Sequence, residues 1–286
     1  MGSAPRAPVG SHVRHRQEFS GHYNGHLLTQ DQLDRIGVVL VSPRNPLNIG
    51  AAARAMANFG FSRLTVVAPF APHWREARSA VGAPDLLQNA KSTECLAEAV
   101  ADCTLVIGTG TRTYRKPEQP VVSLPDLAPL VQWQLERDGK IAAVFGPEKH
   151  GLTRDDLALC HIMVEIPTDP RQPSMNLGQA VAVCLYELTR SKRPDQGSAG
   201  EIPAEAFIRS RTADSGHLDF LAEMVGQTMA AAGYTPRSMQ AANRHDLSVL
   251  LRRLSLSERD AKRILGLFRR ILWRLSRNPQ PNESLK

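Results

Sequence analysis

The sequence predicts an α/β domain with a mostly parallel sheet, followed by a small basic α-helical region. Ile36–Val41 is an unbroken apolar run, which is typical of a strand buried on both faces of a parallel sheet. Further apolar runs alternate with helix-like segments as far as Arg190, an alternation that favours an α/β domain. Beyond that point the apolar spacing becomes helical and arginines accumulate.

The predicted elements follow one another at short intervals along the core. The first strand, Ile36–Val41, leads through a proline-containing turn into a helix over residues 48–59, and Gly60 follows where a left-handed C-terminal cap is expected. Later strands are expected over residues 64–68, 104–108, 141–145 and 162–166, and later helices over residues 92–101, 153–159 and 176–190. Because helices separate the strands, the sheet should be mostly parallel.

Composition divides the rest of the chain. Residues 1–30 contain no apolar segment of the kind that a secretory signal needs, so a flexible N-terminal tail is expected there. The core domain is expected to span residues 31–192. Proline, glycine and serine within residues 193–213 are typical of a linker, and residues 214–286 are expected to form a basic helical extension.

Charge is distributed unevenly along the chain. The whole chain has 35 Lys and Arg against 28 Asp and Glu, a net charge of +7. Residues 234–277 alone hold 11 Lys and Arg against three Asp and Glu, so the excess lies in the helical extension. Apolar residues recur there at helical spacing with arginines between them. This pattern favours a contact with nucleic acid, and a solvated helical face without a partner is the simpler alternative.

Composition and missing motifs exclude several classes of protein. No apolar run approaches the ~18 residues of a membrane helix, so no membrane partner is expected. The four cysteines show no C-x-x-C spacing, which argues against a zinc site and favours a reduced, cytoplasmic protein. The chain has no G-x-x-x-x-G-K-[ST] phosphate loop, no H-E-x-x-H pair and no G-x-S-x-G elbow, and its Gly108-Thr-Gly110 lacks the third glycine of a dinucleotide fingerprint. These absences disfavour kinase, dehydrogenase, metalloprotease and α/β-hydrolase chemistry.

Three segments rich in glycine or asparagine each follow a predicted strand. The first reads N-I-G-A-A-A-R-A-M-A-N-F-G over residues 48–60, and the second reads F-G-P-E-K-H-G-L over residues 145–152. The third reads I-P-T-D-P-R-Q-P-S-M-N-L-G-Q-A over residues 166–180. Ligands of open parallel sheets bind at the carboxyl ends of the strands, so we expect these loops to form one site.

Together the three segments resemble the motifs of the SPOUT superfamily, in its SpoU/TrmH branch of RNA ribose 2′-O-methyltransferases. The resemblance covers residues 36–190, and within the branch the chain is most similar to the TrmJ group, whose core is also followed by a basic helical extension. It implies a SPOUT-type α/β fold with a C-terminal trefoil knot, S-adenosylmethionine as cofactor, and a homodimer that completes the active site. It also implies a tRNA substrate methylated at cytidine or uridine 32 of the anticodon loop, with ribosomal RNA as the alternative substrate.

The motifs of the family fall on identifiable residues of this chain. The implied catalytic residues are Asn48, Arg54, Glu148, Ser174 and Asn176. The implied cofactor-binding residues are Thr109, Gly110, Thr111, Gly146, Ile166, Ser174 and Leu177. Contacts with RNA are expected for Arg54, Arg112 and Arg115, and for Arg252 and Arg253 of the helical extension. No metal ion is expected.

Positioning should dominate the chemistry of such a methyl transfer. A ribose hydroxyl is a weak nucleophile, whereas the methyl group of a sulfonium is already activated. Holding the hydroxyl oxygen, the methyl carbon and the sulfur in line contributes a term that reaches ~7–11 kcal/mol. A guanidinium stays protonated, so we expect Arg54 to clamp a phosphate or stabilise an oxyanion rather than act as a base. Ser174 and Asn176 offer short polar groups that orient the hydroxyl or the cofactor.

Each of these residues also has a purely structural interpretation. Asn48 is a typical helix N-cap, Arg54 a typical surface residue, and Glu148 a typical acid in the first turn of a helix. Ser174 suits the cap of the last core helix. For the whole protein, the alternatives are an RNA-binding protein without turnover and a nucleotide-dependent enzyme on an ordinary doubly wound sheet.

Overall fold

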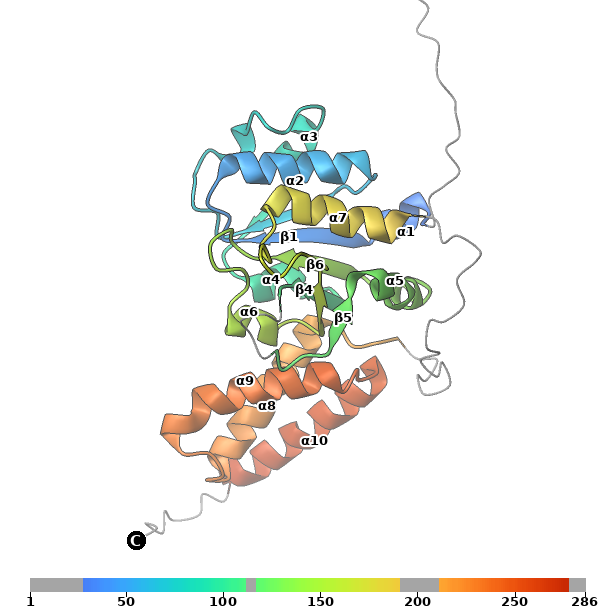
Figure 1. The fold of residues 1–286 in the computed structure, drawn as a ribbon. Coiled ribbons are helices and arrows are strands. Elements are labelled where there is room, and N and C mark those ends of the chain that lie inside the picture. The colour runs from blue at the N-terminus through green and yellow to red at the C-terminus, as the bar shows by residue number, and fades with distance from the viewer. Residues whose placement is uncertain (1–27, 112–116, 191–210, 278–286) are drawn as a thin grey trace, which may run out of the picture.

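The computed structural model describes residues 28–111, 117–190 and 211–277, and its centre is a seven-stranded sheet (Figure 1). The strands are β1 (Ile36–Val41), β2 (Arg63–Val67), β3 (Lys91–Thr93), β4 (Leu105–Thr109), β5 (Val121–Ser123), β6 (Ile141–Phe145) and β7 (Ile162–Glu165). Their order across the sheet is β3-β2-β1-β6-β4-β7-β5, and every pair of neighbours is parallel. The predicted α/β class with a parallel sheet is confirmed.

Helices cover both faces of this sheet. The helices are α1 (Gln30–Asp34), α2 (Pro46–Asn58), α3 (Pro84–Gln88), α4 (Leu96–Val100), α5 (Leu127–Leu135), α6 (Arg154–Ala158), α7 (Leu177–Thr189), α8 (Ser215–Ala231), α9 (Gln240–Arg253) and α10 (Glu258–Arg277), with short 3₁₀ turns at Trp74–Glu76, Leu124–Asp126 and Arg237–Met239. The helices α2 and α7 lie side by side over one face (Figure 1), and their apolar residues share one core cluster with β1 and β6. Residues of α4 and α6 form a second cluster on the opposite face, which explains why all six residues of β1 are buried.

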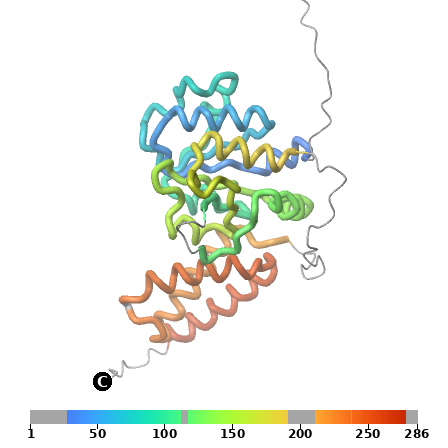
Figure 2. Tube along the Cα trace, viewed as in Figure 1, coloured from blue at the N-terminus to red at the C-terminus, as the bar shows by residue number. Residues whose placement is uncertain are grey.

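Three C-terminal helices form a bundle beside the sheet (Figure 2). Their shared core includes Leu221 and Val225 of α8, Leu251 of α9, and Ile264 and Phe268 of α10. The start of α8 is fixed to the end of α4, because the backbone amides of residues 215 and 216 donate to the carbonyls of residues 103 and 101 at 2.9 and 2.8 Å. Among the residues that the structure describes, no helix has the length and apolar character needed to cross a membrane.

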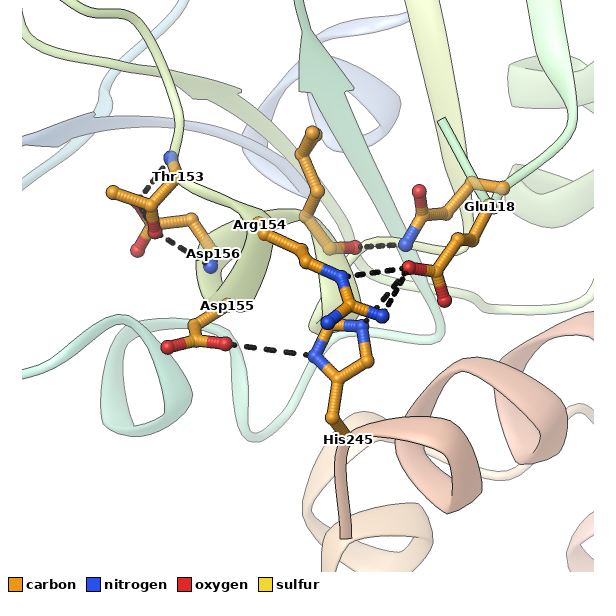
Figure 3. A network of polar contacts seen from close by, with 8 residues as sticks. Glu118, Thr153, Arg154, Asp155, Asp156 and His245 are labelled. Carbon is orange, nitrogen blue, oxygen red and sulfur yellow. Dashed lines mark hydrogen bonds and ion pairs between the residues drawn. The ribbon is translucent and has the colours of Figure 1, made fainter. Parts of the chain in front are cut away.

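A network of polar side chains also joins α9 to the core (Figure 3). Glu118 Oε1 accepts from Arg154 Nε at 2.8 Å and lies 3.3 Å from His245 Nε2, while His245 Nδ1 lies 3.5 Å from Asp155 Oδ1. The hydrogen bond from Arg154 lowers the pKa of Glu118, burial raises it, and His245 lowers it, with a net decrease. Glu118, His245 and Asp246 lie within 4.8 Å of one another. Because the guanidinium on Glu118 would repel a cation, we assign no metal site there.

The five sequence-predicted strands are all present. Those at Ile36–Val41 and Ile141–Phe145 match to the residue, and those expected over residues 64–68, 104–108 and 162–166 begin or end one residue away. The sequence prediction missed β3 and β5, which have three residues each and lie at the two edges of the sheet. Such short edge strands lack the long apolar run that marks a buried strand.

The helix expected over residues 92–101 is wrong at its start. Ser92 and Thr93 pair with β2 in the sheet, and α4 begins only at Leu96. The other core helices lie within two residues of their predicted limits. Gly60 follows α2 with a φ of 78°, so the predicted left-handed cap is confirmed. Helices α1, α3 and α5 were not predicted.

Both predicted domain boundaries need small corrections. Leu28 is buried, and the Thr29 side chain caps α1, so the ordered core begins before residue 31. Thr212 and Ala213 were assigned to the linker, but both are buried and the Ala213 amide donates to the Leu256 carbonyl at 2.9 Å. The rest of the predicted tail and most of the predicted linker lie outside the described residues.

Arg252 is buried, whereas a residue that contacts RNA would lie on the surface. Its side chain is 1% exposed, and its Nη2 lies 2.7 Å from Asp219 Oδ1 of α8. Nη1 donates to the Ser248 carbonyl at 3.3 Å. The guanidinium is therefore a buried link between α8 and α9, and the expectation that it touches RNA is corrected. Its neighbour Arg253 is exposed at the end of α9.

Asp219→Ala should destabilise the helical bundle, because it leaves the Arg252 charge buried without its carboxylate partner. We expect a loss of about 3 kcal/mol in the free energy of unfolding, measured by urea denaturation. Arg253→Ala removes an exposed charge from the same turn of α9 and should change it by less than about 0.5 kcal/mol. Equal effects of the two substitutions would contradict the buried link.

Candidate functional site

The three predicted motifs meet at the carboxyl edge of the sheet. The first begins in the first turn of α2, the helix that follows β1, the second follows β6, and the third connects β7 to α7. Because β1 and β6 are neighbours and α7 packs beside α2, segments more than 90 residues apart in sequence come together. The three segments therefore lie together at this edge, and their action as one ligand site stays a prediction.

Glu148 ties the second motif to the first. Its Oε1 accepts from Asn48 Nδ2 at 2.7 Å and from the Asn45 amide at 3.2 Å, while Oε2 accepts from the Arg44 amide at 3.1 Å. Partial burial raises the pKa of this carboxyl, but the hydrogen bonds from Asn48 and from backbone amides lower it further, and the net pKa is below the ordinary value. The group is thus an ionised acceptor that holds the start of α2.

Asn176 extends these contacts to the third motif. Its Nδ2 donates to Asn48 Oδ1 at 3.0 Å, and its Oδ1 accepts from the amides of Gly178 and Gln179 at the start of α7. A carboxylate only accepts and a helix amide only donates, so both asparagine side chains have a single orientation that satisfies all these bonds. We call Glu148, Asn48 and Asn176 the polar chain, and it connects all three motifs.

Arg54 and Ser174 lie outside the polar chain. Arg54 stands on α2 six residues after Asn48, about 9 Å along the helix axis. Its guanidinium is exposed and makes no hydrogen bond or ion pair with any residue that the structure describes. Ser174 is exposed two residues before Asn176. Both side chains are therefore accessible to a ligand at this edge.

The expected cofactor residues follow three adjacent strands, β6, β4 and β7. Thr109, Gly110 and Thr111 continue from β4, where the Thr109 hydroxyl donates to the Val144 carbonyl at 3.0 Å and the Gly110 amide donates to the Val164 carbonyl at 3.1 Å. Gly146 and Ile166 follow β6 and β7 and are half-buried, and Leu177 is buried at the first turn of α7. Half-buried backbone beside apolar side chains is the type of surface that suits a nucleoside-containing cofactor.

Two glycines allow these loops to approach one another. A Cβ on Gly146 would lie 2.2 Å from the Leu152 backbone nitrogen, and one on Gly178 would lie 2.6 Å from the Ala51 Cβ. Neither distance is compatible with a side chain. The backbone after β6 therefore folds tightly on itself, and α7 begins in contact with α2.

Several sequence interpretations of single residues are corrected here. Asn48 is not the N-cap of α2, because Asn45 has that role and accepts from the Leu47 amide at 3.0 Å. Ser174 is not the cap of α7, since Asn176 is. Glu148 lies in a turn and not in a helix. The motifs do not identify Arg44 and Asn45, whose backbone amides bind Glu148, although Asn45 before Pro46 is a recognisable helix start.

The remaining residues expected to bind RNA are scattered. Arg112 and Arg115 lie outside the described residues. Arg54 is at the carboxyl edge, whereas Arg253 is on the helical bundle. The structure therefore brings the expected catalytic and cofactor residues to one edge of the sheet. Of the described residues expected to bind RNA, Arg54 lies at that edge, and Arg252 and Arg253 lie on the helical bundle.

Comparison with known proteins finds one family of RNA-modifying proteins. The profile of the SpoU rRNA Methylase family matches residues 35–186. A protein of Pseudomonas aeruginosa, tRNA (cytidine/uridine/adenosine-2'-O-)-methyltransferase TrmJ, is 43% identical over 166 residues, which are 58% of this chain and 64% of that protein. The tRNA (cytidine/uridine-2'-O-)-methyltransferase TrmJ of Pectobacterium atrosepticum is 33% identical over 84% of this chain and 96% of that protein.

A solved structure resembles the whole arrangement. The crystal structure of TrmJ from Z. mobilis ZM4 has a TM-score of 0.70 and 30% sequence identity, and the match covers 82% of this chain and 98% of that chain. The similarity therefore extends past the sheet domain into the C-terminal helices.

The polar chain should make the stability of the protein depend on the ionisation of Glu148. Because the folded-state pKa is lowered, the stabilisation is present above the ordinary glutamate value of 4.5 and is lost as the pH falls through the lower folded value. We expect Glu148→Gln to melt about 2 °C below the wild type at pH 7, and the gap to narrow as the pH falls below 4.5. Melting curves from neutral to acidic pH, with Glu136→Gln as a control at an exposed helix end, would measure the difference. A gap that is as wide in acid as at pH 7 would contradict the role of the ionised carboxyl.

Proposed function

The chain belongs to the SpoU rRNA methylase family, and from this premise we propose that it is an S-adenosylmethionine-dependent methyltransferase acting on a ribose 2′-hydroxyl of RNA. The observation that carries the proposal is the polar chain, which joins the three family motifs at one edge of the sheet. The joint presence of Arg54, Glu148, Ser174 and Asn176 argues against an RNA-binding protein without turnover. The nucleotide-dependent alternative lacks the phosphate-binding loops that it requires.

The cofactor fits the loops that follow β4, β6 and β7. Thr109, Gly110 and Thr111 would face it with backbone groups, while Ile166 and Leu177 offer apolar contacts and Gly146 the tight turn between them. When bound, S-adenosylmethionine supplies an activated methyl group. Ser174, three residues before Leu177 in the third motif, would contribute a hydroxyl to the same loop.

The protein itself contributes orientation and charge to the reaction. The polar chain fixes the segments on either side of the site. The positions at which the cofactor and the substrate bind are therefore set before either of them arrives. The planar guanidinium of Arg54 presents two parallel donors. Its role is to bind the phosphate beside the target ribose or to stabilise the oxyanion that develops as the hydroxyl proton leaves for solvent.

The favoured substrate is a tRNA pyrimidine nucleoside, at position 32 of the anticodon loop. Support comes from the names of two relatives, a tRNA methyltransferase of cytidine and uridine from P. atrosepticum and one of cytidine, uridine and adenosine from P. aeruginosa. The family description names rRNA, so ribosomal RNA is the second candidate. A protein that modifies tRNA would act in the cytoplasm.

The proposal includes a trefoil knot in the C-terminal part of the core. What supports it is the path of the chain: after β7 it returns across the sheet to place α7 beside α2, passing the loop that follows β6. The close packing of Gly146 on residues 151 and 152, and of Gly178 on Ala51, is the kind of contact that threading requires.

The proposal also includes a homodimer formed through α2 and α7. These helices expose Leu47 and Tyr186, at 54% and 55%, on the layer that already carries Arg54. A second copy of the chain would cover the apolar residues and complete the surroundings of the guanidinium.

Methyl transfer from labelled S-adenosylmethionine to unmodified tRNA and, separately, to rRNA tests the function directly. A 2′-O-methylated pyrimidine recovered from tRNA by nucleoside analysis would support the whole proposal. Label in rRNA alone would overturn the tRNA assignment and keep the enzyme. No label in either RNA, with cofactor bound, would favour the RNA-binding alternative.

Arg54→Lys should lower kcat about 100-fold, because an ammonium keeps the charge and loses the paired donors. The dissociation constant of S-adenosylmethionine should stay the same. Arg78→Lys, at another exposed position of the core, is the matched control and should leave kcat unchanged. Full activity of Arg54→Lys would exclude a role for the paired donors.

The C-terminal bundle is proposed to bind RNA through exposed arginines of α10. Deleting the bundle would uncover the residues of α4 and α6 that it covers, so substitutions in the full chain give a cleaner test. The triple variant Arg263→Gln, Arg269→Gln and Arg274→Gln should reduce the slope of log Kd for tRNA against log salt by about 2. Lys91→Gln on the edge strand β3 should reduce it by less than 1. An unchanged slope in the triple variant would remove these arginines from the RNA-binding surface.

A further inference from the structure

Phe70 is an aromatic side chain held in solvent beside the polar chain. It lies in the loop after β2 and is 77% exposed, an unusual degree for a phenylalanine. The guanidinium of Arg44 lies over its ring, with Cζ 5.8 Å from the centroid. The ring therefore has a cation on one side and open solvent around the rest.

The backbone fixes this loop against the first motif. The Phe70 amide donates to the Pro43 carbonyl at 3.3 Å. The strand ends that lead into the two loops are strained in the same way, since Ser42 after β1 and Ala68 after β2 have φ values of 44° and 42°. Non-glycine residues adopt this conformation at a cost, and such strain concentrates where loops are aimed for a function.

Phe70 is connected to the catalytic residues through two steps of contact. Its cation partner Arg44 donates its backbone amide to Glu148 Oε2, and Glu148 accepts from Asn48. A ligand on the ring would therefore lie next to the polar chain. Neither Phe70 nor Arg44 belongs to the motifs quoted for the family.

We propose that Phe70 and Arg44 form a stacking platform for an unpaired base of the RNA substrate, at a nucleotide close to the methylated one. This inference rests on the proposed function and deepens it by assigning a substrate contact. Bases of single-stranded loops stack on aromatic rings and on guanidinium planes. The nearby positive charge suits the phosphates that such a loop brings with it. An exposed ring in this place has no packing role that would explain it.

The test compares Phe70→Leu, which removes the ring and keeps an apolar side chain, with Phe70→Trp, which keeps a ring. Methyl transfer to unmodified tRNA should show KM for tRNA raised about tenfold in Phe70→Leu and changed less than twofold in Phe70→Trp. The dissociation constant of S-adenosylmethionine should not change in either variant. A tRNA with one abasic loop nucleotide at a time should identify a position whose loss harms the wild type and adds nothing in Phe70→Leu.

Phe220→Leu is the matched control, the same substitution at an exposed phenylalanine of α8. It lies on α8, outside the polar chain and outside α10, whose arginines are proposed to bind RNA, so KM should not change. Equal KM values for the wild type and Phe70→Leu would overturn the stacking role alone. A Phe70→Leu protein that sediments as a monomer where the wild type is a dimer would overturn it in favour of an interface role. Failure of the wild type to methylate any RNA would overturn the proposed function and this inference together.

Discussion

The ionised side chain of Glu148 is the contact on which the arrangement of the site depends. It accepts two hydrogen bonds from the segment between β1 and α2 and a third from Asn48 in the first turn of α2, and through Asn48 it reaches the start of α7. Without this acceptor, two backbone amides and one side-chain amide at the edge of the sheet would lose their partner. The loops would then be joined only by packing, and their relative positions would be less defined.

The topology of the sheet makes this contact possible. β6 is inserted between β1 and β4, so the loop that carries Glu148 emerges beside the start of α2, which carries Asn48. The return of the chain from β7 to α7 then brings the third motif to the same edge. Gly146 and Gly178 permit the close approach, since a Cβ at either position would collide with neighbouring atoms. The site is therefore a consequence of strand order more than of any single loop.

The fold and the site are predictable from the sequence only where the interacting residues lie close together along the chain. The central strands were predictable because burial on both faces leaves a continuous apolar run, whereas the edge strands β3 and β5 leave none. The motifs identify the proposed catalytic residues, but the hydrogen bond from Asn48 to Glu148 spans 100 residues and that from Asn176 to Asn48 spans 128. No local pattern encodes such pairs.

Neighbouring residues of the same type can have different roles that the sequence pattern does not separate. Arg252 and Arg253 are equivalent in the sequence, yet one is buried against Asp219 and the other exposed, because the packing of α8 on α9 decides which face is inside. Asn45 and Asn48 are both of the residue type that caps a helix, but here a local signal exists. The preference of proline for the first helical position distinguishes them locally, and it favours Asn45.

The most direct test of the central claim is a double-mutant cycle on the polar chain. Asn48→Ala and Asn176→Ala are made singly and together, and kcat for methyl transfer to unmodified tRNA is measured for all four proteins. If the chain acts as a unit, each single substitution lowers kcat by a similar factor and the double variant is hardly slower than either. A double variant whose kcat falls by the product of the two single factors would contradict the account, because it would mean that the two asparagines contribute independently.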